Sequence, residues 1–207
     1  MSDVRAERER DFDRFLTFVD AVVAIAITLL VLPLVDVAGA YQGDSATQLL
    51  SDSSHQIWAF FLSFVVIADL WLTQHRLLHN VVVSEQVVLR LMLVWTLTIV
   101  CLPFPTALVA GNTGHEAVTK TLYVGTMAIS ALVLALLCLV IGRHPELRDS
   151  AETPDHVLAF ATFAAFVAAL AVRLAVPGVS YWPLLLLLVP DRLVRLWRRR
   201  GHPRREA

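Results

Sequence analysis

The chain has 207 residues, of which 57% are hydrophobic and only 17% charged, and its mean hydropathy is +0.66. Soluble domains are about 45–50% apolar and about 25% charged, so neither a soluble globular domain nor a disordered chain fits this composition. The formal net charge of −1 also argues against a nucleic-acid binder, which leaves a polytopic membrane protein.

The charged residues gather at the two ends of the chain. Nine lie in 1–14 and nine in 191–207, so the long middle segment carries only 17 of the 35. So few charges cannot cover a soluble surface of that length. The distribution predicts an all-α fold whose apolar helices cross a membrane.

Six stretches are long and apolar enough to cross a hydrocarbon core of about 30 Å, and we interpret 1–207 as one transmembrane domain. The stretches are 15–34, 56–78, 86–110, 117–141, 157–176 and 181–197. Pro103 and Pro105 should bend or end the third helix in its last turns. Pro190 and the charges that follow it make the sixth helix the weakest of these predictions.

The first apolar stretch is followed by Ala38-Gly39-Ala40, which resembles a signal-peptide cleavage site. Its apolar run is longer than a signal core of about 7–15 residues, and more acids than arginines precede it. We therefore expect this stretch to be kept as a transmembrane helix, with cleavage as the alternative.

The basic residues predict the orientation of the helices. With the N-terminus inside, 15 of the 17 lie in the two tails or in inner loops. Lys120 and Arg173 fall toward the outer side, where Arg173 fits an anchor that extends to the membrane surface. The sequence thus predicts a multi-pass protein of the cytoplasmic membrane with both termini cytoplasmic.

Motifs for enzymatic chemistry are missing from the sequence. There is no P-loop, nucleophile elbow, HExxH zinc motif or dinucleotide fingerprint. His75 and His79 have the spacing of two metal ligands on a helix, but no third ligand accompanies them. Cys101 and Cys138 sit alone in apolar runs, where we expect buried small side chains. We predict no enzyme, no metal and no cofactor.

The first helix carries an apolar stripe along one face. At spacings of three, four and seven residues it comprises Phe18, Val22, Ile25, Leu29 and Leu32. Thr28 lies at the edge of this stripe, and Asp20 lies about 140° from Ile25, so the acid serves another surface. Periodicity alone favours packing or lipid contact for such a stripe over the lining of a pore.

The same helix resembles the first-helix signature of the transmembrane protein 175 family of potassium channels. The matching run is Arg14-x-x-x-Phe18-Val19-Asp20 with the apolar segment 24–30. Two later segments are similar as well, through Ser63, Phe64, Ile67, Trp71, His75 and Leu77 and through 102–108 with Leu122 and Tyr123. The chain departs from the family pattern at Val19, Pro33, Leu70 and Gln74.

The resemblance implies a homotetramer of six-helix subunits in which helix 1 lines a central pore. A single repeat per chain implies the prokaryotic type. The resemblance places the narrow apolar ring at Ile25, further layers at Leu29 and Leu32, and a hydroxyl layer at Thr28. Such channels pass potassium with a modest preference over sodium, and relatives also pass protons. The permeant potassium ion would be the only ligand.

The resemblance also implies a polar network that ties helix 1 to its own subunit, formed here by Arg14, Asp20, Trp71 and His75. A structural role is our interpretation, and a titrating gate through His75 is the alternative. Arg14 and Asp20 lie about 120° apart, so a bridge such as His75 would have to join them. No role is assigned to Asp69.

The residues themselves agree with an apolar constriction. Helix 1 has no glycine and no run that could form a carbonyl filter, so selection would act through diameter and dewetting. Two alternatives to a channel stay open: the protein could be a secondary transporter or a non-conducting membrane scaffold. A transporter would need polar ligands or broken helices at mid-membrane depth, and only Asp69 fits that need.

Overall fold

The computed structural model describes residues 2–41, 45–79, 81, 85–111, 116–144, 147, 163–164 and 167–168. Every regular element in these residues is an α-helix, in agreement with the all-α prediction. In chain order they are α1 (Ser2–Leu29), α2 (Leu32–Ala40), α3 (Ala46–Asp52), α4 (Ser54–Leu78), α5 (Gln86–Cys101), α6 (Pro103–Ala110) and α7 (Glu116–Arg143).

Four segments of the described residues are long and apolar enough to cross a membrane. They are Glu9–Ala40, Ser54–Leu78, Gln86–Ala110 and Thr121–Arg143, in the order of the first four predicted spans. Two predicted helices lie outside the described residues: 181–197 entirely, and 157–176 except for 163–164 and 167–168. Arg173 lies outside them as well. The protein is therefore a helical multi-pass membrane protein.

The first helix begins well before the predicted start at Phe15. Residues 2–14 form a charged extension at the beginning of α1. The prediction that the helix starts at residue 15 is therefore wrong. Opposite charges three residues apart, Glu7 with Arg10 and Asp11 with Arg14, support a helix here. Phe12 is buried although its neighbours in the sequence are charged. Packing at Phe12 thus attaches the extension to the bundle.

Prolines divide two of the spans. Pro33 has no N–H for the carbonyl of Leu29, and the chain tightens so that Leu30 N donates to Ile27 O and Val31 N to Thr28 O, both at 3.3 Å. Pro103 likewise leaves the carbonyl of Ile99 to the amide of Leu102, at 3.2 Å. The prediction that the third span bends near Pro103 is confirmed as the break between α5 and α6.

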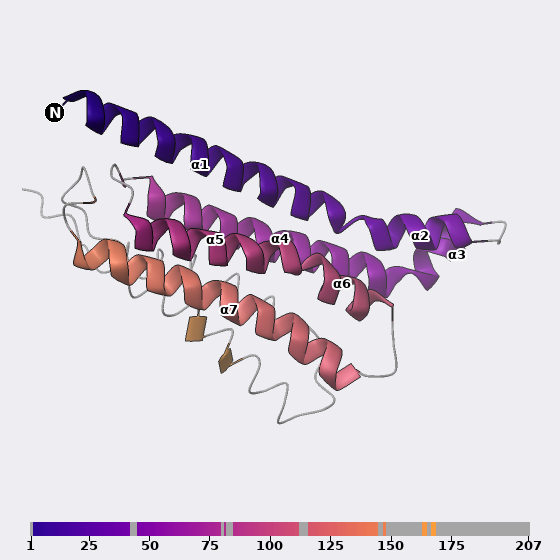
Figure 1. Cartoon of the computed structure of the whole chain (residues 1–207). Coiled ribbons are helices and arrows are strands. Elements are labelled where there is room, and N and C mark those ends of the chain that lie inside the picture. The colour runs from indigo at the N-terminus through magenta and orange to yellow at the C-terminus, as the bar shows by residue number, and fades with distance from the viewer. Residues whose placement is uncertain are drawn as a thin grey trace, which may run out of the picture.

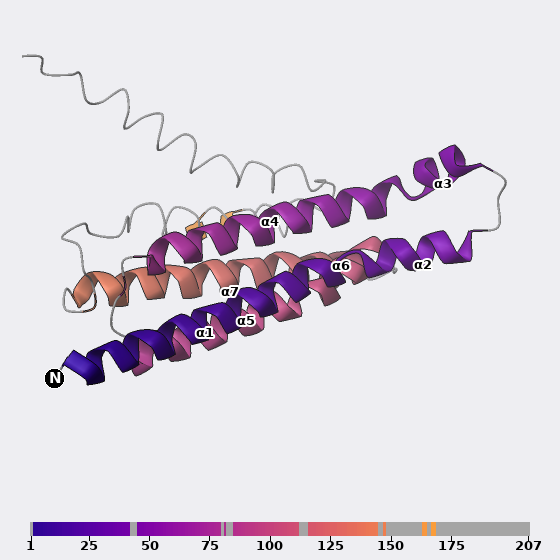
Figure 2. The same cartoon turned by 90° about the horizontal axis from the view of Figure 1, so that it is seen from above.

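The long helices pack side by side, with α5 between α1 and α7 (Figure 1). The short helix α6 packs on α4 and α7, and when the bundle is seen from above α7 appears between α4 and the α1 and α5 pair (Figure 2). Large, fully buried side chains fill the space between the helices, among them Ile67, Leu70, Met92, Trp95, Ile99, Met127, Leu137 and Ile141. This core fixes the surface against which α1 rests.

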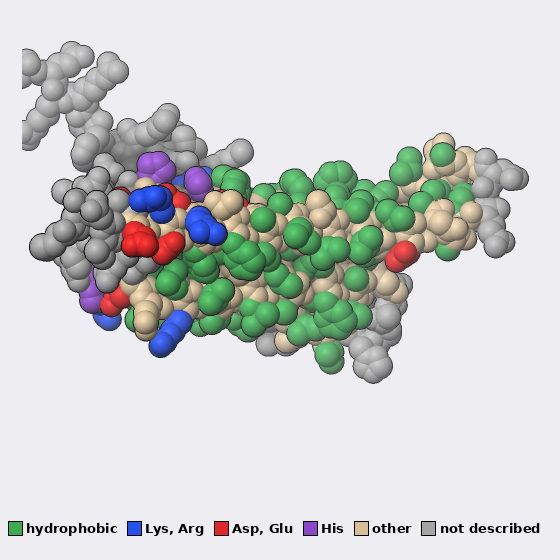
Figure 3. All heavy atoms as spheres, turned by 45° about the horizontal axis from the view of Figure 1, so that its top comes forward, with side chains coloured by type: hydrophobic (Ala, Val, Ile, Leu, Met, Phe, Trp, Pro, Cys, Tyr) green, Lys and Arg blue, Asp and Glu red, His purple; other side chains and the backbone are tan. Residues whose placement is uncertain are grey.

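Charged side chains gather at one end of the bundle (Figure 3). The end of α4, the start of α5 and the end of α7 meet there, and each contributes an exposed arginine: Arg76, Arg90 and Arg143. The charged half of α1 lies at the same end. The structure therefore brings together arginines that the orientation rule assigned to one side of the membrane.

The two cysteines differ in their surroundings. Cys138 is buried in α7, as predicted, whereas Cys101 is exposed, so the prediction is wrong for Cys101. Cys101 is four residues from Leu97 on α5, and both face outward. An apolar run that is exposed on one face explains this difference, because in a membrane protein apolar sequence does not imply burial in the protein.

The packing of α7 can be tested by removing a buried side chain. Leu137→Ala should lower the free energy of unfolding by about 2–5 kcal/mol, because it opens a cavity at a fully buried position. The same change at Leu97, which is 61% exposed on α5, should be close to neutral. Thermal unfolding of both variants in one detergent measures the difference, and equal midpoints would contradict this packing.

Candidate functional site

Helix α1 has two apolar faces with different surroundings. One face packs into the subunit core, through the buried residues Phe12, Val19, Val23, Ala26 and Leu30. These residues recur at spacings of three, four and seven, and α1 contacts α4, α5 and α6. This face fixes the rotation of α1 about its own axis.

The opposite face of α1 is the stripe predicted from the sequence, and most of it is exposed. Phe18, Ile25, Leu29 and Leu32 are exposed, with 59% of Ile25 accessible, and Val22 is half-buried. No described residue of the chain covers these four side chains. The face is therefore available to lipid, to another subunit or to a pore.

Thr28 lies at the edge of this stripe and is exposed. Its hydroxyl donates to the carbonyl oxygen of Ile25 at 2.7 Å. Because the proton is used within the helix, the hydroxyl oxygen presents only its lone pairs to the outside. The stripe is thus apolar except for this acceptor.

The four proposed pore residues do not share one uninterrupted helix. Ile25, Thr28 and Leu29 lie in α1, whereas Leu32 begins α2 beyond the break at Leu30 and Val31. The predicted helix 15–34 is therefore not continuous, since α1 ends at Leu29 and α2 carries the span on from Leu32 to Ala40. A movement of α2 against α1 would displace Leu32 without displacing Ile25.

Asp20 connects α1 to α4. Trp71 Nε1 donates to Asp20 Oδ1 at 2.8 Å, and both side chains are half-buried. The ring of His75, one turn further along α4, lies against the indole with centroids 5.6 Å apart and planes tilted by 33°. Three of the four predicted network residues therefore lie together.

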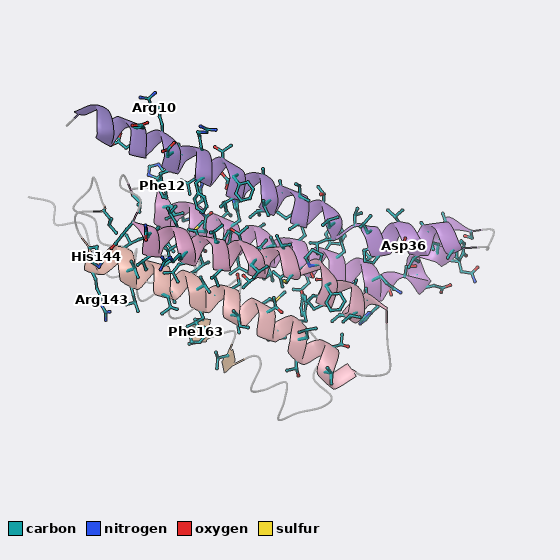
Figure 4. The ribbon with its side chains drawn as sticks, in the orientation of Figure 1. Arg10, Phe12, Asp36, Arg143, His144 and Phe163 are labelled. Atoms are coloured by element: carbon teal, nitrogen blue, oxygen red, sulfur yellow. The ribbon has the colours of Figure 1, made fainter. Side chains whose placement is uncertain are left out.

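Arg14 is not part of this group. Its side chain is exposed on the charged half of α1, and it makes no hydrogen bond or ion pair with any described residue. Arg10, on the same charged half of α1, points away from the bundle, whereas Phe12 points toward it (Figure 4). The predicted bridge from Arg14 to Asp20 through His75 is not formed in this chain.

A cluster of buried hydroxyl groups was not predicted as a site. Ser63 Oγ lies 3.0 Å from Thr106 Oγ1 and 2.8 Å from Tyr123 Oη, which joins α4, α6 and α7. All three residues occur in the segments that resemble the family, but the sequence does not show that they meet. The sequence could have indicated this cluster only through three polar residues that stand within apolar runs.

Two family departures, Leu70 and Gln74, fall on the buried face of α4, and Val19 falls on the buried face of α1. Gln74 Nε2 lies 3.9 Å from the sulfur of Met92. His75 and His79 are both exposed. Within the described residues, no group of three or more potential ligands could hold a metal ion.

Residues 14–103 match the model of a family described as the endosomal/lysosomal potassium channel TMEM175. A solved structure, described as a lysosomal potassium-selective channel TMEM175 homolog from Chamaesiphon minutus, resembles this chain with a TM-score of 0.61 and 23% identity. The similarity covers 88% of this chain and 97% of that one. No curated protein matches the chain. The resemblance to the TMEM175 family found in the sequence is therefore confirmed.

The contact between α1 and α4 can be tested at its tryptophan. Trp71→Phe keeps a ring but removes the N–H, so it should lower the free energy of unfolding by about 1.5–3 kcal/mol, the range for hydrogen bonds to charged groups. Trp95→Phe is the control, because it makes the same change at a buried tryptophan whose Nε1 has no hydrogen-bond partner among the described residues. Detergent unfolding curves compare them, and an equal loss in both would show that the bond to Asp20 contributes nothing.

Proposed function

We propose that this chain belongs to the TMEM175 family and forms a potassium-permeable cation channel of the leak type. It would prefer potassium modestly over sodium and also pass protons. The pore would run along α1 in a homotetramer of six-helix subunits, and its apolar constriction would lie at Ile25. Leu29, Leu32 and the hydroxyl layer of Thr28 would line the path beyond it.

The observation that supports this proposal most directly is the exposed apolar face of α1. The back of the helix is buried in the subunit, and the bond from Trp71 to Asp20 holds it there. A helix fixed in this way presents Ile25 and Leu29 outward in every copy. Copies arranged around an axis would therefore place these residues in successive rings.

An apolar ring selects ions differently from a carbonyl filter. The backbone carbonyls of a helix are engaged in its own hydrogen bonds, so they are not free to replace the water around an ion. An ion passing Ile25 must instead shed part of its hydration shell. Potassium loses water at lower cost than sodium, and since no ligand replaces that water, the preference stays modest.

The location and orientation follow from the charge distribution. We propose the cytoplasmic membrane, with the charged end of the bundle and both termini on the cytoplasmic side. The partners are then the lipid bilayer, three further copies of the chain and potassium ions, without nucleic acid or a cofactor. An ion-channel family also agrees with the lack of enzymatic motifs.

The polar group around Asp20 fits a structural role. The bond to Trp71 joins two helices of one subunit, and the His75 ring packs against the Trp71 indole on the same helix. Such an arrangement holds α1 in place while its other face lines the pore. Gating through titration of His75 is the alternative, and a pH dependence of the current that disappears in His75→Gln would favour it.

A secondary transporter and a non-conducting scaffold are the competing functions. Potassium and sodium flux into liposomes that contain the purified protein, measured under an imposed potential, separates the three. A channel gives flux that follows the electrochemical gradient. Saturating flux that depends on a counter-ion gradient would favour a transporter, and no flux would favour a scaffold.

The constriction can be tested with Ile25→Asn. An amide at this ring should ease dewetting, so the conductance should rise or the preference for potassium should weaken. Leu97→Asn, the corresponding change at an exposed position of α5, serves as the control and should leave both properties unchanged. Single-channel recording in planar bilayers measures them, and unchanged currents in Ile25→Asn would move the constriction elsewhere.

A further inference from the structure

The buried hydroxyl cluster joins three helices at one point. Ser63 from α4 contacts both Thr106 of α6, at 3.0 Å, and Tyr123 of α7, at 2.8 Å. Ser63 Oγ also lies 2.8 Å from the carbonyl oxygen of Ala59, and Thr106 Oγ1 donates to Leu102 O at 2.8 Å. All three side chains are at most 2% exposed. The cluster is therefore shielded from water.

The protons of this cluster allow few arrangements. Its four contacts would each need a proton, but the three hydroxyl groups supply only three. Ser63 is the common member, because its hydroxyl lies within hydrogen-bond distance of both Thr106 and Tyr123. Its own proton can go to Ala59 O or to one of these two hydroxyl groups.

The helices that the cluster joins are also the supports of the break between α1 and α2. Helix α6 contacts α1, and α4 contacts both α1 and α2. Helix α6 is itself separated from α5 by Pro103, so its attachment depends on side chains rather than on a continuous helix. The contact between Ser63 and Thr106 therefore connects α4 and α6, two of the helices that pack against α1.

We propose that Ser63, Thr106 and Tyr123 are positioning residues for the outer part of the ion path. They fix α6 against α4 and α7, and through these helices they set the position of α2 relative to α1 at the break that Pro33 introduces. The layers at Leu29 and Leu32, on either side of this break, then keep their spacing. The inference rests on the proposed function for its effect on ions, but not for its effect on geometry.

Stability alone does not account for the cluster. A buried threonine can satisfy its hydroxyl within its own helix, as Thr96 does by donating to Met92 O at 2.8 Å. Ser63 and Thr106 have the same option through Ala59 and Leu102. Hydrogen bonds between membrane helices stabilise only modestly on average, so the added contacts between helices chiefly select one relative position of α4, α6 and α7.

The first test compares Tyr123→Phe and Ser63→Ala with Thr96→Val. Thr96→Val is the matched control, because it removes a buried hydroxyl that bonds only to its own helix. Unitary conductance and the potassium to sodium permeability ratio are measured in planar bilayers. We expect Tyr123→Phe and Ser63→Ala to change at least one of them by about twofold or more, the low end for coupling through packed side chains, and Thr96→Val to change neither.

The second test measures position directly and needs no conduction. Spin labels at Val35 in α2 and Leu97 in α5, both exposed, report their separation after Cys101 and Cys138 are replaced by alanine. Labelled subunits are diluted with unlabelled ones so that pairs within one chain dominate. Tyr123→Phe should shift or broaden this distance distribution, and Thr96→Val should leave it as in the parent.

The outcomes separate this inference from the proposed function. A parent protein without ion flux but with the expected distance changes would overturn the channel and support the positioning role. Unchanged distances and unchanged permeation in Tyr123→Phe and Ser63→Ala, or changes that Thr96→Val reproduces, would overturn the positioning role. The channel proposal would survive that result, because it rests on the exposed face of α1.

Discussion

Backbone hydrogen bonds that must close within the protein constrain every helix of this chain, because hydrocarbon offers no replacement for a lost partner. Pro33 and Pro103 therefore each interrupt a span. Pro33 withholds a donor from Leu29, and the preceding turn tightens before α2 begins; Pro103 does the same between α5 and α6. Both breaks leave a short helix whose position depends on what packs against it, namely α2 on α4 and α6 on α4 and α7. The half of the bundle away from its charged end thus depends on contacts between helices, because neither span continues through it as one unbroken helix.

The two faces of α1 become distinct through a combination of packing and one hydrogen bond. Both faces are apolar, so hydrophobicity alone would let the helix rotate in a membrane. Burial of Val19 and Val23 against the core and the bond from Trp71 to Asp20 select one rotation. That rotation turns Ile25 and Leu29 outward. Asp20 lies on a third side of the helix, away from both stripes, and its bond to Trp71 acts together with packing to give the exposed stripe a defined direction.

The sequence predicted what depends on local periodicity and composition. The four described spans, the break near Pro103 and the outward stripe follow from patterns within single helices, and the match to the family confirmed the motif resemblance. Contacts between helices were harder to predict. The charged residues 2–14 gave no apolar signal, so their continuation of α1 was missed, and Arg14 was assigned to a network that the structure forms without it. Ser63, Thr106 and Tyr123 are 17 to 60 residues apart, and no periodicity within one helix could show that they meet.

Polar atoms at membrane depth are used here in two ways that differ in what they determine. Thr28 and Thr96 return their protons to carbonyls of their own helix, which satisfies the hydroxyl and carries no information about neighbouring helices. Trp71 with Asp20, and Tyr123 with Ser63, bond across helices and so determine rotation and spacing. The first kind can face an open surface, as Thr28 does, and the second kind belongs inside the subunit. In this chain a few polar contacts between helices therefore determine helix rotation and spacing, while the exposed stripe of α1 stays apolar.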